Sequence, residues 1–156
     1  MFCENNHLPD GFDLKGFAAF IERISLRHYP QIPTGVGFCM YIKREVLNEV
    51  GYFDEQNFQG GYGEENDFCW KASKKGYKHV IDDATFIYHR GGASFTPELK
   101  RAKEDEALRI IDILHPDYIP AVQKFIHEKP LREIHEYISL RIGLEQEKRQ
   151  PVLSGY

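Results

Sequence analysis

The sequence has few cysteines, and those it has are far apart. Cys3, Cys39 and Cys69 are the only three among 156 residues. An odd, widely spaced set of cysteines gives neither a disulfide framework nor the paired spacing of a zinc site. Free thiols suit a reducing compartment, so we expect a cytoplasmic protein.

Long apolar runs and an excess of positive charge are also missing. No run approaches the roughly 20 apolar residues that cross a bilayer, and residues 1–6 show no signal-peptide pattern. The formal net charge of −4 leaves no basic stripe for nucleic acid. We therefore expect no transmembrane segment and no nucleic-acid partner. A hydrophobic content of 42% instead predicts a globular chain with its own core.

A glycine-rich loop followed at once by acids is the most distinctive stretch of the chain. Three of residues 60–63 are glycine, which predicts a tight turn because glycine tolerates backbone angles that other residues avoid. Acids favour the positive end of a helix dipole, so the residues that follow predict the start of a helix. Its first turn carries three acids: Glu64, Glu65 and Asp67. Gly76 is the expected end of this helix.

The three acids have two interpretations. A carboxylate fixed on a first helical turn and open to a cleft has what a general base needs. Glu64 and Glu65 lie one turn before apolar residues, so one or both should point along the core-facing side. Asp67 lies one turn before Lys71 and predicts an ordinary exposed ion pair. The alternative is that the acids only cap the helix, and spacing alone favours this second interpretation.

The rest of the chain predicts helices and a few short strands. Apolar residues at helical spacing predict further helices at residues 14–27, 43–50, 97–114, 116–127 and 131–146. Short apolar runs predict strands at residues 38–42, 77–81 and 85–88. Because helices separate most of these strands, the pattern predicts an α/β fold with a small sheet.

A second candidate for chemistry is His89, which follows the last expected strand and precedes two glycines. A neutral imidazole there can bind a divalent metal. One histidine is too little for a site, since a metal needs further ligands that converge on it. A hydrogen-bonded structural role is the favoured alternative. The remaining histidines are expected on the exposed surface: His7, His28, His79, His115, His127 and His135.

Four motifs in order resemble the family 2 glycosyltransferases. They occupy residues 32–42, 49–55, 61–69 and 86–95. The resemblance implies a partial GT-A (nucleotide-diphospho-sugar transferase) fold, with a small mixed sheet and flanking helices. Residues 1–96 would form the C-terminal, acceptor-side half of that domain, and residues 97–156 a helical extension. The nucleotide-binding half and its Asp-x-Asp motif are not found, so we expect a fragment of a longer polypeptide that is weakly active or inactive alone.

The resemblance also implies a reaction and roles for residues. The reaction is transfer of a sugar from a nucleotide-sugar donor to an acceptor hydroxyl, with inversion, as in surface polysaccharide synthesis. Glu65 matches the catalytic base, although this chain has Glu where Asp is usual, and Asp67 is the second choice. Glu64 would position the acceptor. Residues expected to line the acceptor side are Gly61, Tyr62, Gly63 and Trp70, although either aromatic residue is at least as well explained by core packing.

A metal and a set of partners follow from the same resemblance. His89 would join a divalent metal, Mn or Mg, that bridges the donor diphosphate and acts as a Lewis acid. The expected partners are the nucleotide-sugar donor, a carbohydrate or lipid-linked acceptor, and the missing N-terminal half. The expected location is the cytoplasm or the inner face of the membrane. The alternative function is a non-catalytic module that binds a carbohydrate or a partner protein.

Overall fold

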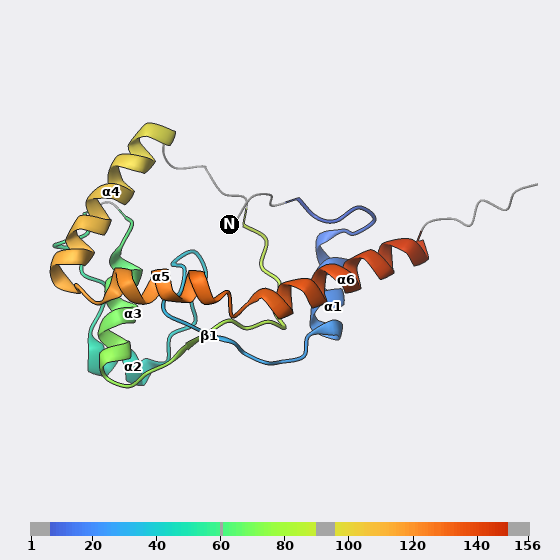
Figure 1. Cartoon of the computed structure of the whole chain (residues 1–156), viewed down its shortest axis with the longest axis horizontal. Coiled ribbons are helices and arrows are strands. Elements are labelled where there is room, and N and C mark those ends of the chain that lie inside the picture. Colours follow the sequence, from blue (N-terminus) through green and yellow to red (C-terminus); the bar gives the residue numbers. More distant parts are fainter. Residues whose placement is uncertain (1–6, 60, 90–95, 150–156) are drawn as a thin grey trace, which may run out of the picture. The chain divides into compact units, whose positions relative to one another are not determined.

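The described chain is mostly helical. The computed structural model describes residues 7–59, 61–89 and 96–149, in which six helices and one two-stranded sheet form. The elements in chain order are α1 (Leu14–Ile24), β1 (Gln31–Ile32), α2 (Arg44–Val50), α3 (Glu64–Lys74), β2 (His79–Val80), α4 (Pro97–Leu114), α5 (Tyr118–Glu128) and α6 (Arg132–Arg149) (Figure 1). The expected α/β, partial GT-A fold with a mixed sheet is therefore wrong.

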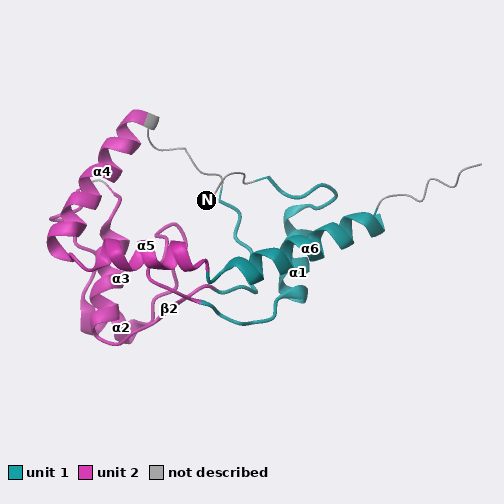
Figure 2. Ribbon diagram, in the orientation of Figure 1, with its two compact units in different colours: residues 1–30, 82–91, 130–156 teal, residues 31–81, 92–129 magenta. Residues whose placement is uncertain are grey.

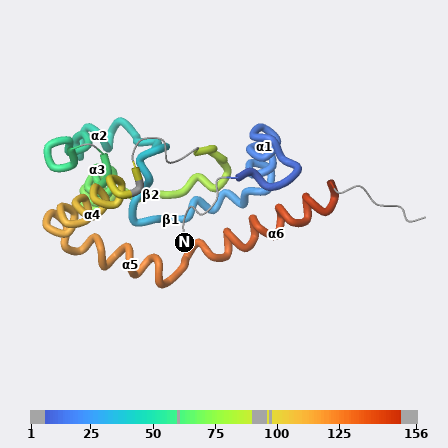
Figure 3. The backbone as a smooth tube through the Cα atoms, turned by 90° about the horizontal axis from the view of Figure 1, so that it is seen from above, coloured from blue at the N-terminus to red at the C-terminus, as the bar shows by residue number. Residues whose placement is uncertain are grey.

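Two of the three expected strands do not form. Residues 38–42 and 85–88 have no strand pairing. In the first run Phe38 is 51% and Tyr41 92% exposed, so the side chains are not buried as those of an internal strand would be. A short apolar run carries no periodicity that distinguishes a strand from irregular backbone. The third expected strand is confirmed in its centre as β2, which pairs antiparallel with β1 beside it (Figure 3).

The chain divides into two compact units (Figure 2). Unit 1 comprises residues 1–30, 82–91 and 130–156, and unit 2 comprises residues 31–81 and 92–129. Each unit contains segments from before and after residue 96. The boundary between two domains that the sequence predicts at residue 96 stays a prediction. Within the described ranges, no helix is long and apolar enough to cross a membrane.

Unit 1 is built around α1. The buried face of this helix consists of Phe17, Phe20, Ile21 and Ile24, as the helical spacing of these residues predicts. The Asp13 side chain caps the helix by accepting a 2.7 Å hydrogen bond from the Gly16 backbone N–H. Phe86 meets Phe17 edge to face, with the ring centroids 4.7 Å apart. Local periodicity and a capping residue therefore define this helix.

Asp83 holds the segment after α1 in place. Its carboxylate accepts hydrogen bonds from Ser25 Oγ at 2.9 Å, from the His28 N–H at 3.3 Å and from the Tyr29 N–H at 3.0 Å. Burial raises the pKa of Asp83, but these hydrogen bonds outweigh it and the net pKa is lowered. Arg27 and Tyr29 have positive φ angles of 52° and 45°, which are strained for residues with a Cβ. The aspartate bonds stabilise this strained backbone.

Unit 2 contains two hydrophobic clusters on either side of α3. One cluster packs α3 against α2 and consists of Val46, Phe68, Cys69 and Ala72. The other packs the loop before α3 against α4 and α5 and consists of Phe58, Ala107, Ile111 and Tyr118. The α3 helix is therefore fixed by both neighbours, and its first turn is held firmly where the three acids lie.

Candidate functional site

The loop before α3 has the tight turn that its glycines predict. Gly61, Tyr62 and Gly63 have consecutive positive φ angles of 85°, 78° and 94°. A Cβ at Gly63 would lie 2.7 Å from Phe58 Cδ1 and 2.9 Å from Ala107 Cβ, closer than atoms can pack. Gly63 is therefore needed both for its backbone angle and for the close approach of α4. Because Gly63 is the N-cap of α3, this packing fixes the start of the helix.

Asp67 is enclosed at the first turn of α3. It is 0% exposed, and its Oδ2 lies 2.6 Å from Lys71 Nζ. The predicted pairing with Lys71 is confirmed, but the expectation of an ordinary exposed pair is wrong. Two groups around the carboxylate offset the cost of burying its charge. Lys71 supplies a cation beside Oδ2, as an ion pair whose geometry is not that of a hydrogen bond, and His115 Nε2 lies 2.8 Å from Oδ1.

His115 follows the last residue of α4 and is 6% exposed, so its expected place on the surface is wrong. Its Nδ1 lies 3.4 Å from Lys74 Nζ. An ammonium group can only donate, so Nδ1 accepts from Lys74 and the Nε2–H donates to Asp67. A relay of Lys74, His115 and Asp67 thus connects the end of α4 to the first turn of α3. The sequence gives no local signal for it, because 48 residues separate Asp67 from His115.

Glu65 has a different environment from Asp67. It is half-buried, and burial raises the pKa of its carboxyl. Backbone hydrogen bonds oppose this rise, while the charge of Glu64 adds to it. A Cβ at Gly37 would lie 3.7 Å from Glu65 Cδ, so the glycine leaves space beside the carboxyl group. Glu65 is therefore a partly desolvated carboxylate that keeps some access to solvent.

Glu64 completes the set of acids. It is half-buried, and its Oε2 is enclosed without a hydrogen-bond partner among the residues that the structure describes. The charge of the neighbouring Glu65 also acts on Tyr118, whose pKa is raised to about 12, chiefly by burial. The first turn of α3 thus carries three carboxylates, of which Asp67 has a positively charged side chain, Lys71, beside it.

The two aromatic candidates make contacts within unit 2. Trp70 is half-buried, donates from Nε1 to Asp117 Oδ1 at 3.0 Å, and meets Tyr118 edge to face at 5.2 Å. Tyr62 packs against the cluster around Phe58. These are the contacts of packed side chains, which is the alternative that the sequence left open. Stacking of either ring on a sugar stays a prediction.

A second buried group near α3 is the Cys69 thiol, which accepts from the Gly35 N–H at 3.4 Å. Burial raises the pKa of Cys69, but hydrogen bonds from His79 and Gly35 outweigh it and the net pKa is lowered. His79 Nε2 also lies 2.9 Å from the Cys69 carbonyl oxygen and 3.1 Å from Ser73 Oγ. His79 is half-buried, so its expected exposure is also wrong, and its contacts are those of a structural histidine.

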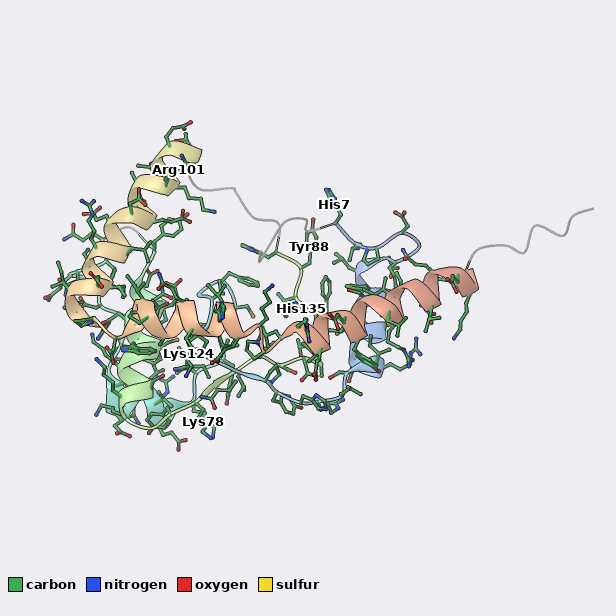
Figure 4. The ribbon with its side chains drawn as sticks, viewed as in Figure 1. His7, Lys78, Tyr88, Arg101, Lys124 and His135 are labelled. Carbon is green, nitrogen blue, oxygen red and sulfur yellow. The ribbon has the colours of Figure 1, made fainter. Side chains whose placement is uncertain are left out.

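His89 belongs to unit 1, whereas the acids of α3 belong to unit 2. It is exposed and follows Tyr88, which is labelled in Figure 4. Within residues 7–59, 61–89 and 96–149, no three His, Cys, Asp or Glu side chains gather closely enough to hold a metal. These residues do not complete a site for Mn or Mg around His89, and the metal stays a prediction. The glycines and the serine expected beside His89 lie outside the described residues.

Comparison with known proteins gives no family for this chain. It matches no protein-family model, no curated protein and no solved structure. The resemblance to family 2 glycosyltransferases therefore stays a prediction from sequence motifs. The acids of α3 have to be judged on their own geometry.

Proposed function

We propose that this chain carries the catalytic base of an inverting sugar transfer, and that Glu65 is that base. The observation that supports this most strongly is the contrast within a single helical turn. Glu65 is partly desolvated with a raised pKa, while Asp67 is closed off by Lys71 and His115. A raised pKa makes a carboxylate a stronger proton acceptor, and partial exposure lets a substrate hydroxyl reach it.

The other two acids suit supporting roles. Asp67 is fully enclosed and already binds two groups, so it stabilises the turn and does not contact a substrate. Glu64 keeps its Oε2 enclosed and contributes charge that raises the pKa of Glu65. This arrangement favours Glu65 over Asp67, the second candidate for the base in the sequence. Glu64 keeps the proposed role of positioning the acceptor.

The proposed chemistry is a single displacement. The acceptor hydroxyl oxygen forms a bond to the anomeric carbon of the donor as Glu65 takes the hydroxyl proton. The bond from the anomeric carbon to the nucleotide diphosphate breaks, and its electron pair leaves with the diphosphate. The anomeric configuration is inverted because the acceptor attacks opposite the leaving group. A nucleotide-sugar donor and a divalent metal remain parts of the proposal that rest on the motif resemblance, as does a role in polysaccharide synthesis.

The experiment that tests this proposal is Glu65→Gln in the polypeptide that also supplies the donor-binding half. Gln has nearly the same shape but cannot accept the proton. We expect transfer to slow by roughly 100-fold or more, with acceptor affinity unchanged. The matched control is Glu98→Gln, which makes the same change in the first turn of α4, where the side chain is exposed. An unchanged transfer rate in Glu65→Gln would remove Glu65 as the base.

A further inference from the structure

Unit 2 has a pocket beside the glycine loop that precedes α3. Its volume is about 290 Å³, and it is lined by residues 56–59, Gly61 and Tyr62 and by the middle of α4, from Lys103 to Ile110. Arg101, labelled in Figure 4, lies on α4 just before these residues. The pocket lining is mostly polar, and its apolar part is supplied by Phe58, Ala107 and Ile110. The pocket is at the lower end of the size range of small-molecule sites, which suits a ligand of one ring.

The polar part of the wall is rich in carboxamide groups, supplied by Gln56, Asn57 and Gln59. Each carboxamide has two N–H donors and a carbonyl acceptor, although Asn57 Nδ2 already donates to Asp54 and Gln59 Nε2 to the Gln56 carbonyl oxygen. A pair of adjacent hydroxyl groups, each of which donates and accepts, matches such a wall. Tyr62 adds one aromatic ring, so the lining combines amide groups with an aromatic face.

Charge in the pocket is balanced. The α4 helix contributes one cation, Lys103, and one anion, Glu106. A phosphate or carboxylate ligand would meet Glu106, and a cationic ligand would meet Lys103. A neutral ligand has neither conflict and can accept a hydrogen bond from the lysine while donating one to the glutamate.

The wall is fixed before any ligand binds. Asp54 Oδ1 accepts from the Gln56 N–H at 3.1 Å and the Asn57 N–H at 3.0 Å, and its Oδ2 accepts from Asn57 Nδ2 at 2.8 Å. The bonds from Asn57 are the main cause of a lowered Asp54 pKa. Tyr62, which also lines the pocket, has a strained backbone between two glycines with positive φ. Strain of this kind is often found where a ligand is clamped.

Two exposed polar side chains that line the pocket have no polar partner in the described part of the chain. Gln56 and Glu106 are exposed, and their side chains make no hydrogen bond or ion pair with another residue of the described chain. Both are therefore available to a ligand without first breaking an internal bond. Gln56 comes from the loop before α3 and Glu106 from α4, so the two side chains belong to different segments of the pocket lining.

We propose that this pocket binds one neutral hexose unit of a carbohydrate. The inference rests on the proposed function in that a carbohydrate acceptor would supply the sugar, but the pocket does not include Glu65. It would hold a sugar unit of the acceptor other than the unit whose hydroxyl group reacts. Hydroxyl groups would bind the carboxamides, Lys103 and Glu106, and the carbon atoms of the ring would lie against Tyr62 and Ile110.

The experiment is a titration of the isotope-labelled full chain, followed by amide NMR. The ligands are D-glucose and D-galactose, with D-glucuronate and glucose 6-phosphate as charged comparisons. We expect the neutral sugars to shift the side-chain amide signals of Gln56 and Gln59. Gln56→Ala and Glu106→Ala should each weaken hexose binding by about fivefold or more, because each removes one hydrogen bond to the ligand. The matched control Gln123→Ala removes an exposed amide on α5 and should leave binding unchanged.

Three results would overturn the proposal. They are shifts confined to residues outside the pocket, equal or tighter binding of the charged sugars, and no shift with any sugar up to high millimolar concentration. Hexose binding that survives in Glu65→Gln supports the pocket whatever happens to transfer. A loss of transfer in Glu65→Gln, without hexose binding to the wild-type chain, would support the proposed base and reject the pocket.

Discussion

Each unit contains a carboxylate that is at least partly shielded from water, and folding shifts the pKa values of these two carboxylates in opposite directions. In unit 1 the hydrogen bonds from Ser25, His28 and Tyr29 outweigh burial and lower the pKa of Asp83. In unit 2 burial outweighs the backbone hydrogen bonds of Glu65 and raises its pKa. A satisfied carboxylate stabilises backbone, whereas an under-satisfied one is available for chemistry. Asp67 of unit 2 is fully buried, with Lys71 beside Oδ2 and His115 beside Oδ1.

The largest effect is expected from His115→Ala, which breaks the enclosed acid of unit 2. It removes the Nε2–H that donates to Asp67 and leaves the buried carboxylate with Lys71 as its one side-chain partner among the described residues. We expect a loss of about 3 kcal/mol in the free energy of unfolding, measured by urea denaturation. The control is His127→Ala, at an exposed position near the end of α5. A loss in His115→Ala no larger than that of the control would show that the relay does not stabilise α3.

The next effect is expected from Asp83→Ala in unit 1. The change leaves the N–H groups of His28 and Tyr29 without their acceptor beside strained backbone. We expect a loss of about 2 kcal/mol in stability at neutral pH. The control is Asp112→Ala, at an exposed site on α4.

Lowering the pH should reduce the difference in stability between wild type and Asp83→Ala. The folded-state pKa of Asp83 is lowered, so its contribution is fully present above the ordinary aspartate pKa of about 3.9. It is lost as pH falls through that value towards the lowered pKa. The difference between wild type and Asp83→Ala should therefore shrink in acid. A difference that stays constant across this range would contradict the account of Asp83.

Glu65→Gln should change the stability at neutral pH in the opposite direction from Asp83→Ala. The pKa of Glu65 is raised on folding, so the folded chain binds the proton more tightly than the unfolded chain. Ionised Glu65 then destabilises the fold at neutral pH, and the penalty builds up as pH rises from the ordinary glutamate value through the raised one. We expect Glu65→Gln to be at least as stable as wild type at neutral pH, with the difference shrinking in acid. A less stable variant at neutral pH would refute the assignment.

The smallest effect on stability is expected from Gly37→Ala. This change alters the surroundings of the Glu65 carboxylate without removing its charge, and so tests the contrast with Asp83. A Cβ there would lie 3.7 Å from Glu65 Cδ, an ordinary contact. Stability should change by no more than about 0.5 kcal/mol. The added methyl group excludes water from the carboxyl group, so the pKa of Glu65 should rise further, measured by carboxyl carbon NMR. A fall in that pKa would mean that the side chain does not lie against Gly37.

Helices were the part of the fold that the sequence predicted well. The bounds expected for α4 agree with the structure, and α2 begins one residue later than expected and ends as expected. Proline at the start of α4 and glycine after α2 are local signals that act within one turn. Strands depend on pairing between distant segments, and this explains why the expected sheet was wrong. Gln31 and Ile32, which do pair, carry no strand pattern of their own.

The candidate site was predictable only in part. The glycine loop and the three acids of α3 are consecutive in sequence, so their placement at the start of one helix could be expected. The division of roles among the acids could not. It depends on His115, which comes from the end of α4, and on Gly37 beside Glu65. No pattern within a helical turn indicates which carboxylate a distant side chain will enclose.

The pH titration of the Glu65 carboxyl carbon, with Asp83 followed in the same experiment, tests the central claim most directly. The account predicts a Glu65 midpoint above the ordinary value of about 4.3 and an Asp83 midpoint below the ordinary value of about 3.9. A Glu65 midpoint at or below its ordinary value would contradict the claim, because the carboxylate would then be fully solvated or already paired.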